Sequence, residues 1–99
     1  MTAITYEQAR DLVRDRLQPT WAPGTFCIDD RKIVENPEMF VFEVGAREFL
    51  KDQDPTYAST LGGVNVVYKT DGRIDTLASL QVATDPSITR RDNPSPTFS

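Results

Sequence analysis

Carboxylates are the main groups in this chain that could do chemistry, because its 99 residues include 15 acidic side chains, no histidine and one cysteine, Cys27. Without histidine there is no Ser-His or Cys-His nucleophile and no imidazole metal ligand. A single cysteine excludes an internal disulfide, a CxxC pair and an all-cysteine zinc site. We expect Cys27 to be a small buried hydrophobic residue. These absences favour a binding protein over an enzyme.

Two closely spaced acidic pairs are the candidates for acid–base or metal chemistry. Asp29 and Asp30 are adjacent, so on a strand their side chains would point to opposite faces and could not share a proton. In a turn they would hydrogen-bond the local backbone instead. Asp52 and Asp54 have the spacing that begins a calcium loop, but the later glycine and glutamate of that motif are missing. We therefore predict no catalytic residue, no metal and no other cofactor.

The acidic residues are concentrated in one part of the chain. Residues 29–54 contain eight acidic and four basic side chains, and the rest of the chain is balanced, so this region supplies the whole net charge of −4. This balance argues against nucleic-acid binding, which usually needs a basic face. It favours the electrostatic attraction of a basic protein partner. A solvated sheet face would carry the same charges without any partner.

The first element that must position these groups is a helix over about residues 5–17. Thr5 followed by Gln8 fits a capping box, and Pro19 ends the helix. One apolar stripe follows at helical spacing, formed by Ala9, Leu12, Val13 and Leu17. Beyond it we expect Trp21 to close one end of the core, with an exposed interface anchor as the alternative.

From residue 25 the apolar pattern changes to the alternation of strands. Strands are predicted at residues 25–28, 32–35, 39–45, 47–51, 64–70 and 73–79. Asp71-Gly72 indicates a hairpin between the last two. A three-residue loop, residues 70–72, with Gly72 left-handed, would align the apolar residues on one face. In that register Val64, Val66 and Tyr68 share one face of the sheet with Ile74, Thr76 and Ala78.

The predicted fold is α+β, with one N-terminal helix packed on an antiparallel meander sheet of four to five strands. Residues 1–83 form the single domain. Residues 84–99 are rich in proline and poor in large apolar residues, so we expect a loosely ordered, flexible tail. In the alternative the tail lies over the sheet and Phe98 docks. The sequence lacks a signal-peptide pattern and a roughly 20-residue apolar run, which predicts a cytoplasmic protein with no membrane partner.

Residues 39–74 carry a resemblance to a known family. An aromatic-containing strand (Phe40-Val41-Phe42), a segment with a further aromatic (Phe49) and the Leu61-Gly62-Gly63 stretch are followed by an apolar strand and the Asp71-Gly72 hairpin. Together with the opening ITYEQARDLV, this order resembles the immunity protein 35 family of YrhB-like small bacterial proteins. A tryptophan common in the family's first strand is absent here, and the proline-rich tail is a further departure.

The resemblance implies a non-catalytic immunity protein that binds and neutralises a cognate bacterial toxin in the producing cell. An acidic face would suit a basic toxin such as a nuclease, and a peptidase-like toxin is also compatible with the family. No catalytic residue carries over. Our candidate partner-binding residues are in the long loop after residue 51 and on the segment before it: Glu43, Glu48, Asp52, Asp54 and Tyr57. Tyr57 would be the aromatic anchor, and the carboxylates would steer the partner.

Two other classes of function stay open from the sequence. One is a small structural or assembly module, such as a homodimer joined through sheet edges or an accessory protein. The other is a small-molecule-binding domain that uses a cavity between helix and sheet. A weak hydrolase that relies on carboxylates comes last.

Overall fold

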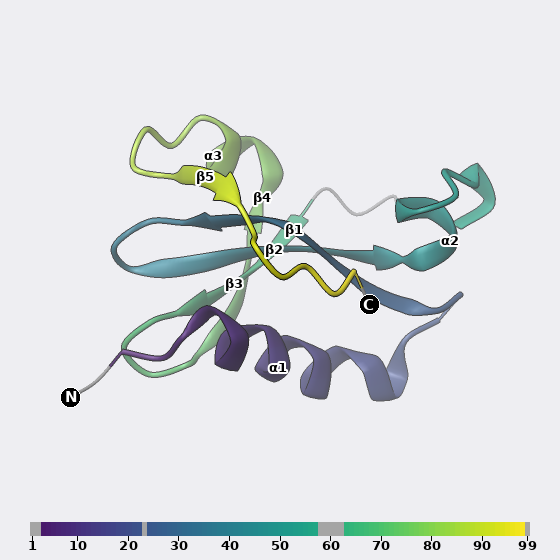
Figure 1. Ribbon diagram of the computed structural model, residues 1–99, viewed down its shortest axis with the longest axis horizontal. Helices are drawn as coiled ribbons and strands as arrows, with labels where there is room; N and C mark the ends of the chain where they lie inside the picture. The colour runs from purple at the N-terminus through teal and green to yellow at the C-terminus, as the bar shows by residue number, and fades with distance from the viewer. Residues whose placement is uncertain (1–2, 23, 58–62, 99) are drawn as a thin grey trace.

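The structure, a computed structural model, describes residues 3–22, 24–57 and 63–98, without the side chain of Tyr57. Its elements are α1 (Tyr6–Leu17), η1 (Gln18–Thr20), β1 (Phe26–Glu35), β2 (Met39–Ala46), α2 (Arg47–Leu50), η2 (Pro55–Tyr57), β3 (Gly63–Tyr68), β4 (Ile74–Ala78), α3 (Ser79–Ala83) and β5 (Thr89–Asp92). The strands form one antiparallel sheet in the order β4-β3-β2-β1-β5, with α1 along one side (Figure 1). The predicted α+β architecture, a helix on an antiparallel meander, is confirmed.

Helix α1 begins with the predicted capping box. Thr5 Oγ1 accepts from the Gln8 amide at 3.1 Å, and Gln8 Oε1 accepts from the Thr5 amide at 2.9 Å, so two otherwise unpaired N–H groups are satisfied. Ala9 and Val13 are fully buried, whereas Leu12 stays 39% exposed. The sequence pattern missed Tyr6, which is buried and stacks on Phe42 with 5.1 Å between ring centroids. Burial raises the pKa of Tyr6 to about 12.

The two faces of the sheet are covered differently. On the helix face, α1 packs on a continuous core that includes Ile28, Phe40, Phe42 and Val67. Trp21 closes one end of this core edge-on against Phe26, as expected. On the opposite face a smaller cluster joins the sheet to α3 and the segment that follows it, and its buried members are Met39, Val41, Val66, Val82 and Ile88. We call this opposite side the groove face.

Strand β1 contains extra residues in its centre. Asp29 pairs with Glu43 and Val34 pairs with Val41, so four residues of β1 (30–33) lie opposite one residue of β2, and three residues are in excess. The sequence predicted a turn at Asp29-Asp30 between two short strands, but the chain stays in one irregular strand. Asp29 and Asp30 point to opposite faces, as expected for neighbours on a strand. Asp30 is fully buried, and Asp29 lies beside Glu43 on the groove face.

One predicted strand is a short helix instead. Residues 47–51 form no strand, because α2 turns the chain back over the end of β2. Its Arg47 amide donates to Thr25 O at 2.8 Å, and Leu50 packs over Gly45, where a Cβ atom would come within 3.3 Å of Leu50 Cγ.

The hairpin between β3 and β4 is shifted by one residue from the predicted register. Its loop has four residues, 69–72, because the Gly72 and Tyr68 amides donate to Tyr68 O and Arg73 O, both at 2.9 Å. Gly72 is left-handed, as predicted, with φ of 72°. The shift pairs Val67 with Ile74, and both contribute to the core on the helix face.

The C-terminal residues differ from the expected loose tail. Strand β5 adds a fifth strand beside β1, and the chain then crosses β1 towards α1 (Figure 1). The amides of Thr97 and Phe98 donate to the Asp30 carboxylate, and the Phe98 ring lies under Arg31 at 4.6 Å. This matches the alternative in which the tail lies over the sheet. The composition predicted a loose tail because large apolar side chains are few. The tail is held instead by polar groups that bind a buried carboxylate.

Candidate functional site

A pocket of about 490 Å³ opens on the groove face, between α2 and α3. Its floor is made by valines of three neighbouring strands, Val34, Val41 and Val64. Val82 and Ala83 of α3 form one wall, and Phe49 and Leu50 of α2 form the other. The lining also includes four charged residues: Asp29, Glu43, Lys32 and Arg90. We call this site the groove.

The groove exists because the two short helices cover only the ends of this face. Val82 and Ile88 pack over Met39, Val41 and Val66, while Leu50 covers Gly45 at the other end of β2. Glu43 lies between Val41 and Gly45 on the same side of β2, since alternate residues of a strand share a face. Glu43 is thus the residue of β2 that lies between the part covered by Val82 and Ile88 and the part covered by Leu50.

The acidic end of the groove contains an unbalanced pair of carboxylates. Asp29 is held by Arg31, whose Nη2 lies 2.8 Å from Asp29 Oδ2, and this hydrogen bond lowers the pKa of Asp29. Glu43 is directly opposite Asp29 and makes no hydrogen bond or ion pair with any other residue in the described ranges. Desolvation by the groove raises the pKa of Glu43, and the Asp29 charge adds to the rise. Like charges opposite each other on neighbouring strands are destabilising.

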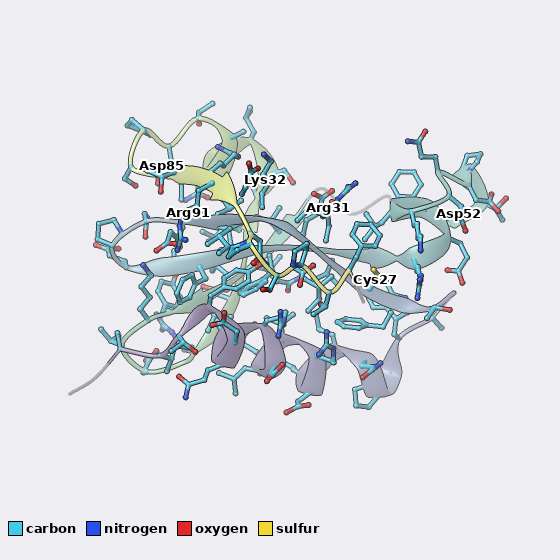
Figure 2. All side chains as sticks on the ribbon, in the orientation of Figure 1. Cys27, Arg31, Lys32, Asp52, Asp85 and Arg91 are labelled. Carbon is cyan, nitrogen blue, oxygen red and sulfur yellow. The ribbon has the colours of Figure 1, made fainter. Side chains whose placement is uncertain are left out.

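The other end of the groove is basic. Lys32 is paired with Asp92 of β5, and Figure 2 shows Lys32 and Arg31 on the side of the sheet away from α1. Arg90 of β5 is opposite Val34 of β1. Its guanidinium has no ion-pair partner within the described part of the chain. Strand β5, which the sequence did not predict, therefore supplies this end.

Large apolar side chains stand exposed beside the groove. Phe49 on its wall is 38% exposed, and Leu80, one residue from Ser79 in the lining, is 74% exposed. Isolated exposed apolar residues are common on protein surfaces. Here, however, they border an apolar concavity that also holds an unpaired carboxylate. Such a mixed surface can bind an elongated side chain with an apolar stem and a charged end.

The five predicted partner-binding residues do not come together in one place. Glu43 lines the groove, but Glu48 is engaged in holding the chain, because its carboxylate accepts from the amide and hydroxyl of Thr25 at 3.0 and 2.9 Å. Asp52 is exposed beyond α2 (Figure 2). Asp54 caps the turn that follows by accepting from the Thr56 amide at 3.0 Å. Tyr57 ends η2, and its side chain lies outside the described residues, as do residues 58–62 of the long loop.

Sequence reasoning missed three contributors to the groove. Asp29 was assigned to a turn, Phe49 was placed on a strand at residues 47–51, and Arg90 was assigned to the tail. Because β1 is irregular, apolar and polar residues do not alternate along it, and the sequence could not show which face of the sheet Asp29 lies on. The signal for Phe49 was the adjacent Gly45-Ala46, which marks a change of chain direction.

Metal and thiol chemistry receive little support from the described residues. No group of three or more histidine, cysteine, aspartate or glutamate residues in these ranges could hold a metal ion. Cys27 is buried, as expected, and burial raises the pKa of its thiol. A helix long and apolar enough to cross a membrane is likewise missing from this part of the chain.

Comparisons with known proteins add no relative. No protein-family model matches the chain, and neither a curated protein nor a solved structure matches it. The family resemblance stated for residues 39–74 therefore stays a prediction. The groove and its charges are the basis for the function proposed next.

Proposed function

We propose that this protein is a non-catalytic, immunity-type protein that neutralises a cognate bacterial toxin by binding it through the groove. The observation that carries the proposal is the exposed carboxylate of Glu43, which lines the groove with Val41, Val64 and the exposed Phe49 and has no hydrogen-bond or ion-pair partner among the described residues. Binding sites often retain such unfavourable charge arrangements, because a partner can satisfy them. The acidic balance of the chain supports a basic partner.

The groove suits a lysine or arginine side chain of the toxin. Its methylene stem would pack on Val41, Val64 and Phe49, and its charged end would reach Glu43. A hydrogen bond between charged groups contributes about 1.5–3 kcal/mol. Neutralising Glu43 would also relieve its repulsion with Asp29. The same contact would therefore be more favourable than an ordinary surface ion pair, which contributes about 0–1 kcal/mol.

The remaining predicted residues have different roles in this proposal. Asp52 and the exposed part of Asp54 increase the association rate at long range. Tyr57 stays a candidate aromatic contact. Glu48 contributes through the position of α2, and thus of Phe49, since it anchors the helix to Thr25.

The test is co-expression with the toxin encoded beside the gene, together with binding kinetics of the purified pair. Glu43→Gln and Phe49→Ala should each weaken binding at least tenfold and reduce rescue of growth. Glu38→Gln is the matched charge control, because Glu38 is an exposed glutamate outside the groove lining. Leu12→Ala is the matched apolar control, because Leu12 is 39% exposed on the other side of the sheet.

Two outcomes would contradict the proposal. Growth rescue and affinity that are unchanged by both groove variants would remove the groove from the interface. A neighbouring gene product that is harmless on its own would remove the immunity role. If Asp52→Asn slows association without changing dissociation, Asp52 acts by long-range electrostatic attraction of the toxin, as proposed.

A second candidate function, small-molecule binding, is favoured by the size of the groove. Its volume of about 490 Å³ lies within the usual range for ligand sites, roughly 300–1,000 Å³. The site differs from the cavity between helix and sheet that the sequence suggested, where Tyr6, Phe40 and Phe42 fill the space. A metabolite that raises the melting temperature of the wild type but not of Val41→Trp would support this function.

A further inference from the structure

Asp30 is a fully buried carboxylate that binds the C-terminal residues. Its oxygens accept from the Thr97 amide at 2.9 Å, the Thr97 hydroxyl at 2.7 Å and the Phe98 amide at 2.7 Å. Arg10 of α1 supplies the counter-charge, with 3.2 Å between Nη1 and Oδ2. The Asp30 carbonyl also accepts from Asn93 Nδ2 at 2.7 Å. We call this set of contacts the latch.

The rest of β5 is weakly attached to the molecule. It is four residues long, and all four side chains are exposed. Its side-chain contacts are two ion pairs, Lys32 with Asp92 and Arg91 with Glu35, and one hydrogen bond from the Thr89 hydroxyl to Glu35 O at 3.2 Å. Exposed pairs contribute about 0–1 kcal/mol each. Before β5, Ile88 packs in the apolar cluster, and Ser87 Oγ accepts from Asn36 Nδ2 at 3.2 Å. The residues that follow β5 are therefore held at a buried polar site, the latch, whereas β5 itself is held at the surface.

The latch and the groove are connected through β5. This strand supplies Arg90 to the groove, and its Asp92 pairs with Lys32, a second residue of the lining. Residues 93–98 follow β5 directly, and the last two of them donate hydrogen bonds to the Asp30 carboxylate. If these residues leave Asp30, β5 is held by its pairing with β1, the two ion pairs and the hydroxyl of Thr89. The basic end of the groove then loses its fixed position.

We propose that Asp30 is a positioning residue for the groove: by binding residues 93–98 it holds β5, and with it Arg90 and Lys32, in place for the partner. The part of this inference that concerns partner binding rests on the proposed function. The part that concerns β5 does not, because it can be measured on the isolated protein.

The experiment measures tryptic cleavage after Arg90 and Arg91 in the folded protein, because both residues lie within β5. Thr97→Pro removes both Thr97 donors at a distance from the apolar core, and Thr97→Val removes the hydroxyl alone. Cleavage should become at least tenfold faster in Thr97→Pro and less so in Thr97→Val. Thr97→Ser, which keeps both donors, should behave as the wild type. Circular dichroism checks that the helix and sheet stay folded.

The same variants are then measured for binding to the neighbouring toxin. Thr97→Pro should weaken binding at least fivefold, whereas Glu43→Gln should weaken it without changing cleavage. Unchanged cleavage in Thr97→Pro would overturn the latch. Faster cleavage with unchanged affinity, for a toxin that Glu43→Gln does weaken, would overturn the link from latch to groove. If Glu43→Gln and Phe49→Ala leave affinity unchanged, the proposed function fails while the cleavage result still decides the latch.

Discussion

Asp29 and Asp30 are neighbours in the chain, yet they have opposite surroundings. Asp30 is fully buried and receives hydrogen bonds from Arg10, Thr97 and Phe98. Asp29 lies in the groove with one exposed partner, Arg31, and a second carboxylate opposite it. On the helix face the carboxylate of Asp30 is paired with a guanidinium and with the C-terminal residues, and these contacts hold the chain together. On the groove face the exposed carboxylate of Glu43 has no ion-pair partner within the described ranges, and in the proposed function this partner comes from another molecule.

The largest difference between the two faces should appear in their phenylalanines. Phe42→Ala on the helix face should lower the free energy of unfolding by about 3–5 kcal/mol, because the side chain is 1% exposed in the core. Phe49→Ala on the groove wall should change it by about 1 kcal/mol or less, since that ring is already 38% exposed. Urea denaturation of both variants measures the difference. Equal losses would mean that Phe49 belongs to the folded core.

A smaller contrast is expected between the two aspartates. Asp30→Asn should lower the free energy of unfolding by about 3 kcal/mol, because Arg10 loses its buried counter-charge. Asp29→Asn should change it by no more than about 1 kcal/mol, since the lost pair with Arg31 is offset by less repulsion of Glu43. Chemical denaturation at pH 7 gives both values. A larger loss for Asp29→Asn would reverse the roles assigned to the two faces.

Acid should affect the helix face through Asp30. Burial raises the pKa of this carboxyl, but the hydrogen bonds from Thr97, Phe98 and Arg10 outweigh that effect, so its pKa in the folded protein is below the ordinary 3.8. The unfolded chain then binds the proton more readily. The stabilisation is complete above pH 3.8 and is lost as the pH falls through the lower, folded-state value. Urea midpoints between pH 2 and 6 should decline less steeply in Asp30→Asn than in the wild type.

The smallest effect is expected for Glu43 and has the opposite sign. Its pKa is raised in the folded state, so the charged form destabilises the fold at neutral pH. Glu43→Gln should therefore raise the free energy of unfolding by about 0.2 kcal/mol, the low end of the range for a cross-strand charge pair, because Glu43 is exposed and solvent screens its charge. The gain should shrink as the pH falls through the raised folded-state value and be absent below 4.5. A loss of stability at pH 7 would show that Glu43 is already satisfied within the chain.

The sequence predicted the helix and the fold class well because their signals are local. The Thr5–Gln8 capping box and the spacing of Ala9 and Val13 specify α1 without reference to other elements. The strands around it were found for the same reason, since alternation is visible within a few residues. Details that depend on distant contacts were missed, such as the register that places Ile74 beside Val67 under α1.

The candidate site was only partly predictable from the sequence. Glu43 was identified from its charge and its strand, but the groove needs α2, α3 and β5 around it. Residues 47–51 were assigned to a strand, and the four residues of β5 include no large apolar residue that would mark it. The buried state of Asp30 could not be predicted either, because Arg10 is 20 positions earlier and its other donors, Thr97 and Phe98, are 67 and 68 positions later in the chain.

That separation in sequence has a consequence for the order of folding. The hairpins β1–β2 and β3–β4 join segments close in sequence, and such contacts form early because their loops close at small entropic expense. Asp30 must wait for residues 97 and 98 before its hydrogen bonds are complete. We expect the four-stranded meander with α1 to assemble first and β5 to dock afterwards. The binding surface would thus be finished in the last step of folding, on a scaffold that is already in place.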